Sequence, residues 1–146
     1  MGMFDSININ ATGLTAQKTR IDIISKNMAN AETTRGTGGM PYRRQMVVFQ
    51  EMKSNPFEHY LSNETKKAQG EGVKISKIVE DKTPFKLVYE PGHPDADEDG
   101  YVKMPNVDMI KETVDLIDAQ RAYEANITAM NATKAILMKS LDIGRK

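Results

Sequence analysis

The residues best suited to chemistry in this sequence lie in one acidic loop of the second half. Three alternate carboxylates and a glycine have the spacing that opens an EF-hand calcium loop: Asp95, Asp97, Asp99 and Gly100. The twelfth position of such a loop needs a bidentate glutamate, and Asn106 stands there. We therefore interpret the segment as an acidic surface loop, and keep a soluble calcium- or ligand-binding module that uses residues 95–99 as the alternative function.

Other side chains give no sign of an active site. His59 and His93 are far apart and lack the spacing of metal ligands. The chain has no Gly-x-Ser-x-Gly nucleophile motif, and no carboxylate stands alone in an apolar run, where its pKa would rise. The absence of cysteine excludes disulfides and thiolate metal sites. We expect no enzyme, no catalytic residue, no cofactor and no metal site.

Composition narrows the class of protein further. Lys and Arg number 20, as do Asp and Glu, so the formal net charge is zero and the basic surface of a nucleic-acid binder is not expected. A length of 146 residues suits one domain with, at most, a small inserted lobe. No apolar run approaches the ~20 residues of a membrane span. The first residues lack the pattern of a cleaved secretory signal.

The element that must position everything else is the run Asn106–Leu141. It contains neither Gly nor Pro and is rich in good helix formers. Pro105 and Gly144 are plausible boundaries, and Asn106 or Asp108 is expected to cap the first turn. At ~1.5 Å per residue such a helix is roughly 50 Å long. A compact domain of this size cannot hide it, so a partner helix is required.

Both ends of the chain carry an apolar stripe with coiled-coil spacing. Steps of four and three along the C-terminal run give six apolar residues out of eight: Leu116, Gln120, Tyr123, Ile127, Met130, Lys134, Leu137 and Leu141. The N-terminal segment gives the same proportion: Met3, Ile7, Asn10, Leu14, Gln17, Ile21, Ile24 and Met28. We predict that the two terminal helices pack along each other. The alternative is two ordinary amphipathic helices in a small bundle, and the length of the C-terminal run favours the rod-like pair.

The middle of the chain predicts a small lobe rich in β-strands. Short apolar or alternating runs indicate strands at Met46–Phe49, Val73–Val79 and Phe85–Glu90. The last two are expected to pair through a turn at Asp81–Pro84, while Lys53–Gly72 is expected to be a loop. A lobe of three or four strands buries little apolar surface by itself, so we expect it to pack against the helices.

The predicted fold class is therefore α+β. Long N- and C-terminal helices pair in a coiled-coil-like arrangement around the small β-rich insert. Residues 1–35 are assigned to the N-terminal helix, 36–104 to the loop and the insert, and 105–146 to the C-terminal helix.

Several separated motifs occur in a distinctive order. The sequences ATGLTAQ (11–17) and NMANAETT (27–34) resemble the N-terminal signature that bacterial flagellar rod and hook proteins share. GMPYRR (39–44), YEPGHPDAD (89–97) and RAYEAN (121–126) narrow the resemblance to the flagellar basal-body rod family, and within it to the proximal-rod component of type C. Gln50–Gly72 is the only unspecific part.

The resemblance implies a structural, non-enzymatic subunit of the flagellar basal body. Such subunits assemble helically, with themselves and other rod proteins, into the rod that transmits motor torque across the periplasm. The base of the rod lies at the membrane ring. The resemblance also implies export through the flagellar type III apparatus without a cleaved signal. Terminal helices of the family are disordered before assembly and then form its inner, coiled-coil-like layer.

Residues of both apolar stripes and of the segment after the first helix are predicted to contact neighbouring subunits. Asn27–Arg44 is expected to dock onto adjacent subunits and fix the helical register, through small residues, amides and arginine forks. An ordinary helix end followed by a surface loop remains the alternative. The predicted interface residues are Leu14, Ile21, Ile24, Asn27, Met28, Asn30, Arg43, Arg44, Leu116, Tyr123, Ile127, Met130, Leu137 and Leu141.

Overall fold

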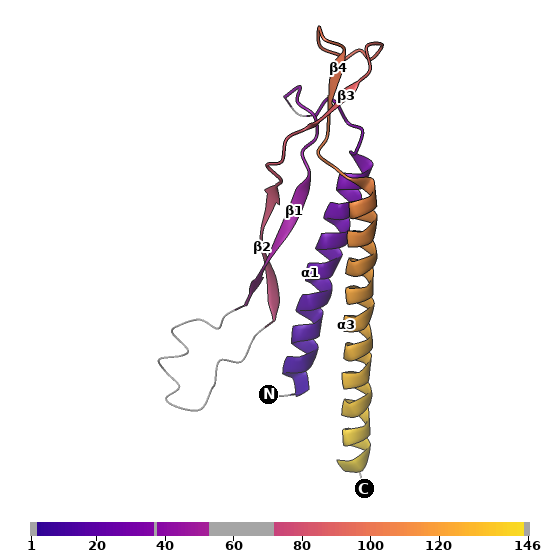
Figure 1. Cartoon of the computed structure of the whole chain (residues 1–146). Helices are drawn as coiled ribbons and strands as arrows, with labels where there is room; N and C mark the ends of the chain where they lie inside the picture. The colour runs from indigo at the N-terminus through magenta and orange to yellow at the C-terminus, as the bar shows by residue number, and fades with distance from the viewer. Residues whose placement is uncertain (1–2, 37, 53–71, 145–146) are drawn as a thin grey trace, which may run out of the picture.

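The computed structural model describes residues 3–36, 38–52 and 72–144 and shows an elongated molecule (Figure 1). Most of the loop expected at 53–72 lies outside these residues. The described chain forms two helices and four strands: α1 (Met3–Ala29), β1 (Gln45–Glu51), β2 (Val73–Glu80), β3 (Lys86–Tyr89), β4 (Tyr101–Met104) and α3 (Met109–Gly144).

The two terminal helices lie side by side along their length, which confirms the predicted pair (Figure 1). Two alanines that belong to neither predicted stripe, Ala16 of α1 and Ala119 of α3, are buried. With 36 residues against 27, α3 exceeds α1 by about 14 Å at ~1.5 Å per residue. Its C-terminal end therefore extends past the first residues of α1 (Figure 1). Neither helix, over the residues described, is long and apolar enough to cross a membrane.

The start of α3 is set by Asp108. Its Oδ1 accepts hydrogen bonds from the backbone N–H of Ile110 (3.0 Å) and Lys111 (3.5 Å), two groups that have no partner within the helix. Asp108 is thus the N-cap of α3, which confirms one of the two residues that the sequence offered for this role. Asn106, the other, instead accepts a hydrogen bond from the backbone N–H of Arg44.

The four strands form two separate antiparallel ribbons. β1 pairs with β2 from Gln45↔Glu80 to Glu51↔Val73, and β3 pairs with β4. The expected pairing of Val73–Val79 with Phe85–Glu90 is therefore wrong. The residues between them do not make a tight turn, because the N–H of Asp81 extends the β1–β2 ladder to the carbonyl of Arg44. The chain then continues to β3 at the far end of the molecule (Figure 1).

The β1–β2 ribbon lies along α1, as expected (Figure 1). Thr12 of α1 attaches the ribbon at the end where β2 begins. The Thr12 hydroxyl accepts from the N–H of Val73 (3.1 Å) and donates to the carbonyl of Ile9 (2.7 Å). Gly72 packs against this hydroxyl with a φ of 109°, and a Cβ at Gly72 would lie 2.2 Å from the Thr12 Oγ1. A side chain at position 72 would therefore disturb this attachment.

Candidate functional site: the junction of helices and ribbon

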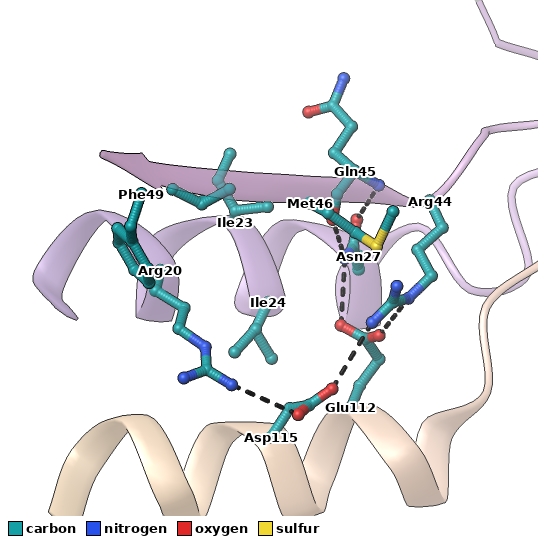
Figure 2. Close-up of a pocket in the computed structure, with 11 residues that line it drawn as sticks. Arg20, Ile23, Ile24, Asn27, Arg44, Gln45, Met46, Phe49, Glu112 and Asp115 are labelled. Carbon is teal, nitrogen blue, oxygen red and sulfur yellow. Dashed lines mark hydrogen bonds and ion pairs between the residues drawn. The ribbon is translucent and has the colours of Figure 1, made fainter. Parts of the chain in front are cut away.

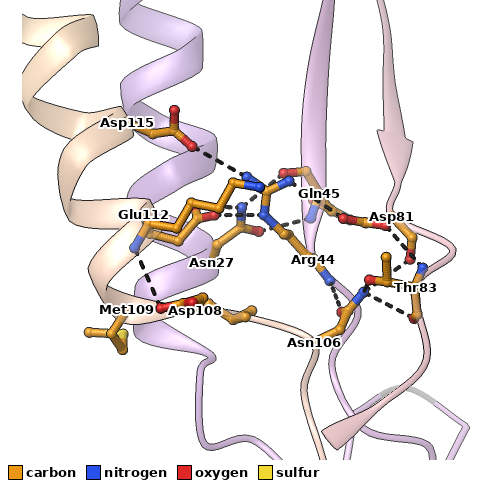
Figure 3. A network of polar contacts seen from close by, with 12 residues as sticks. Asn27, Arg44, Gln45, Asp81, Thr83, Asn106, Asp108, Met109, Glu112 and Asp115 are labelled. Carbon is orange, nitrogen blue, oxygen red and sulfur yellow. Dashed lines mark hydrogen bonds and ion pairs between the residues drawn. The ribbon is translucent and has the colours of Figure 1, made fainter.

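Three elements meet where α1 ends, β1 begins and α3 begins, and Asn27 connects them (Figure 3). Asn27 is only 1% exposed. Its Nδ2 donates to the carbonyl of Gln45 (2.8 Å), and its Oδ1 accepts from the N–H of Gln45 (2.9 Å). The side-chain amide therefore pairs with the backbone of β1 as a neighbouring strand would. The same amide donates to Glu112 Oε2 (3.0 Å) and accepts from the Tyr42 hydroxyl (2.8 Å).

Glu112 is a fully buried carboxylate at 0% exposure. Its charge is compensated by Arg44, whose Nε lies 2.6 Å from Oε1, and by the Asn27 amide. Arg44 Nη1 also lies 3.6 Å from Asp81 Oδ2, and Arg44 Nη2 lies 3.5 Å from Asp115 Oδ2. Removing one member of a buried ion pair costs several kcal/mol, because it leaves the other charge desolvated and unpaired. The arginine thus holds together three segments that are distant in sequence.

Asn106 ties the segment before α3 to the end of β2 (Figure 3). Its Oδ1 accepts from the N–H of Arg44 at 2.8 Å. Its Nδ2 lies 3.2 Å from the carbonyl of Asp81 and 2.8 Å from the Thr83 hydroxyl. These bonds satisfy backbone groups at the edge of the ribbon and fix the direction in which the chain leaves it.

Two protonation equilibria are shifted at the junction. The pKa of Asp81 is lowered, mainly because its carboxylate accepts a hydrogen bond from the Thr83 backbone N–H, and further by Arg44. The pKa of Tyr42 is raised by burial and then by the negative charges of Glu112 and Glu80. Asp81 therefore stays ionised and Tyr42 stays protonated at neutral pH, the states that their hydrogen bonds require.

A groove of about 370 Å³ opens beside this network (Figure 2). We call it the junction groove. α1 contributes its floor, β1 one wall and α3 the other; the lining residues are Arg20, Ile23, Ile24, Asn27, Arg44, Gln45, Met46, Val47, Phe49, Glu112 and Asp115. The charged side chains follow the side of the groove nearest α3 and pair with one another: Asp115 lies 3.4 Å from Arg20 and 3.5 Å from Arg44 (Figure 2). The side formed by β1 is mostly apolar and suits an apolar side chain from outside.

The acidic loop between β3 and β4 uses its carboxylates within the chain. Asp95 accepts a hydrogen bond from the Thr34 hydroxyl (2.8 Å) and pairs with Arg35, and both interactions lower its pKa, Thr34 most. Asp97 Oδ1 accepts from the N–H of Tyr101 at 3.1 Å. Within the described ranges, no group of three or more His, Cys, Asp or Glu side chains is placed to hold a metal ion.

The predicted interface residues fall into two groups. Those of the stripes are buried or half-buried on the two helices, except Leu141, which is 69% exposed: Leu14, Ile21, Ile24, Met28, Leu116, Tyr123, Ile127, Met130 and Leu137. The polar ones bind within the chain. Asn30 Nδ2 donates to the carbonyl of Lys26 (2.8 Å), which closes the end of α1. Arg43 donates to the carbonyl of Asp81 (3.0 Å) and stacks on Phe85, 4.5 Å from the ring centroid.

Sequence reasoning missed Glu112, Asp115, Tyr42 and Gln45 as members of the junction. A glutamate in the first turns of a helix usually indicates a solvated surface or a favourable charge at the N-terminus. The sequence offers no signal for Glu112, because neither Glu112 nor Ala119, which lies seven residues later on the same buried face of α3, belongs to the predicted stripe.

The comparisons with known proteins agree along the chain. Residues 7–36 match the family model described as flagella basal body rod protein, and residues 98–143 match that of the flagellar basal body rod FlgEFG protein C-terminal. The flagellar basal-body rod protein FlgC of Bacillus subtilis (strain 168) is 50% identical, over 99% of this chain and 100% of its own length. That of Borreliella burgdorferi is 46% identical, over 98% of each chain. That of Escherichia coli O157:H7 is 40% identical, over 99% of this chain and 100% of its own. The chain therefore belongs to the FlgC family of flagellar basal-body rod proteins, and is a structural, non-enzymatic subunit that serves motility.

Proposed function

We propose that the chain polymerises through α1 and α3, with copies of itself and with other rod proteins, to build the proximal rod that transmits motor torque. The observation that carries this proposal is the apolar surface left open on α3. Eight large apolar side chains of α3 are between 43% and 79% exposed: Met109, Ile110, Val114, Ile117, Ile136, Met138, Leu141 and Ile143. So much exposed apolar surface on one helix is typical of a protein–protein interface.

The shape of the subunit suits a tube built from parallel helices. The α1–α3 pair is long and narrow, and the β3–β4 ribbon lies beyond one end of it (Figure 1). A single pair leaves the outer side of α3 uncovered, whereas a layer of adjacent pairs covers it. The junction also fixes the β1–β2 ribbon to both helices, so a twisting load on the ribbon passes directly into the helix pair.

The same proposal places the subunit in the periplasmic part of the basal body, next to the base of the rod at the membrane ring, after export through the flagellar type III apparatus without a cleaved signal peptide. Family membership supports this route. The small core supports it too, because few apolar side chains in the described part of the chain are buried: Ala16, Ile24, Val102, Val107 and Ala119. Unfolding for export therefore exposes little apolar core to water.

An assembly test uses Ile136→Asp, because Ile136 is 61% exposed and its replacement should leave the isolated fold intact. Asn131→Asp is the matched control, since it adds the same charge at an exposed polar position of α3. We expect Ile136→Asp to keep the melting temperature of the purified chain, to be absent from isolated basal bodies and to abolish swimming. The control should swim. Normal swimming by Ile136→Asp cells would refute assembly through this face.

A further inference from the structure

We propose that the junction groove receives three residues of α3 from a second copy of this chain, Ile110, Val114 and Ile117, which we call the outer stripe. This inference rests on the proposed function, since it names one of the contacts through which the subunits polymerise. It assigns a partner to a groove that the fold leaves open and to an apolar stripe that the described chain leaves uncovered.

The outer stripe has the form of a helix anchor. Its members recur at spacings of four and three, so they share one face of α3. They are 79%, 54% and 43% exposed, whereas Glu112 and Ala119 on the opposite face are fully buried. The outer face of these turns is therefore exposed and the inner face is buried, so among the described residues only the inner face packs within the subunit.

The groove offers the matching surface. Met46 and Phe49 form its β1 wall and are 36% and 37% exposed, while Ile24 in its floor is 5% exposed (Figure 2). The apolar part of the groove lies on its β1 side and on the isoleucines of α1, whereas Glu112 and Asp115 make its α3 wall polar. A groove with one apolar side and one polar side accepts anchors spaced by three and four residues from an amphipathic helix. Its volume of about 370 Å³ suits a few aliphatic side chains rather than a whole domain.

The position of the two surfaces identifies the second copy as the occupant. Glu112 and Asp115 line the groove and alternate with the outer stripe on the same turns of α3, so groove and stripe lie at one level along the long axis and face opposite ways. A neighbour rotated about an axis parallel to the helices, with little translation, brings its stripe to this groove. Such a contact is heterologous, so it repeats from copy to copy in a ring or helix.

Charge supports the same pairing. Arg20 at the groove is 33% exposed and pairs with Asp115 at 3.4 Å, so its exposed guanidinium can take a further acceptor. Asp118 and Arg121, both exposed, follow the stripe on the outer side of α3 and bring both signs of charge. A contact of three side chains is much smaller than the ~1,200 Å² of a stable protein pair. It therefore forms in the assembled rod, supported by other contacts, and not in dilute solution.

The test uses disulfide crosslinking, because the chain has no cysteine of its own. Val114→Cys and Phe49→Cys are combined in one chain, expressed in flagellated cells, oxidised, and analysed in isolated basal bodies on a non-reducing gel. We expect a ladder of dimers and larger multiples, since each copy links to two neighbours. Either single variant, and the control pair of Val114→Cys with Lys18→Cys on the exposed face of α1, should run as monomers.

Each other outcome has a defined meaning. A dimer from Val114→Cys alone would show a symmetric contact and overturn the proposal, as would a crosslink to a protein of different mass. A chain that is present in basal bodies but never crosslinked would overturn the stripe–groove contact alone. Absence of the unsubstituted chain from rods would instead overturn the proposed function.

A second variant covers the case in which the cysteine pair does not assemble. Val114→Asp should lose rod incorporation without a change in the melting temperature of the purified chain. Thr113→Asp changes the residue directly before Val114, which does not belong to the outer stripe, and this variant should be incorporated normally. Equal incorporation of the two variants would overturn the proposal.

Discussion

Asn27 is the residue on which the junction most depends, and Asn27→Leu removes its polar groups at similar volume. Four hydrogen bonds of 2.8–3.0 Å disappear. They leave the N–H and C=O of Gln45, the hydroxyl of Tyr42 and one oxygen of Glu112 without their partner. α1 then loses its buried polar bonds to β1 and to α3, while the more exposed pairs Arg20–Asp115 and Lys26–Gln45 remain.

The magnitude follows from which of these groups can reach water. Tyr42 is half-buried, so its hydroxyl can regain a water partner. The two backbone groups and the Glu112 oxygen remain, and at about 1–1.5 kcal/mol for each unsatisfied group the loss is roughly 3–4.5 kcal/mol. Since a domain of this kind is stable by about 5–15 kcal/mol, Asn27→Leu should lose a large part of its free energy of unfolding.

The assay is urea denaturation of the purified chain, followed by far-ultraviolet circular dichroism. Asn30→Leu is the matched control, because it removes the same group about one turn later, where the amide donates to the Lys26 carbonyl and accepts from the Thr33 hydroxyl at the helix end, both groups that water can reach. Its loss should not exceed about 1 kcal/mol. If Asn27→Leu lost no more than Asn30→Leu, the amide would not be a structural connection and the account of the junction would be wrong.

Two further predictions concern the ribbon and pH. Gly72→Ala should destabilise the chain by about 1–3 kcal/mol, from the strain of a positive φ and a displaced Thr12 hydroxyl, whereas Gly92→Ala, where a Cβ meets open space, should be near neutral in the same denaturation assay. Because the pKa of Asp81 is lower in the folded state, its contribution is complete above its unfolded pKa and is lost as pH falls through the folded value. Stability should thus fall from about pH 5 downward, and less steeply in Asp81→Asn, a difference that melting curves across this range measure.

The helices and their pairing could be predicted because each rests on a long periodic pattern. The stripes running to Met28 and from Leu116 repeat over several turns, and no glycine or proline interrupts the C-terminal run. Asp108 could be named as a cap because capping depends on residues within one turn. Helix formation and capping depend on residues close together in the sequence, and the structure agrees with both predictions.

Strand pairing and the junction could not be predicted because they depend on contacts between distant segments. β2 pairs with β1 across an intervening segment and not with β3, which follows it, and nothing in the alternation of β2 distinguishes the two partners. Glu112 is buried only because Arg44 and Asn27 reach it from other elements. The sequence assigns Asn27 to contacts between subunits, a role that stays a prediction beside its connection within the chain.

An image reconstruction of isolated basal bodies, at a resolution that traces side chains, tests polymerisation through α1 and α3 most directly. We expect α1 and α3 of each subunit to remain paired and to run close to the rod axis. Ile136 and Leu141, now 61% and 69% exposed, should be covered by helices of neighbouring subunits. Helices that separate from each other, or an outer face of α3 that stays open to solvent in the rod, would contradict this mode of polymerisation.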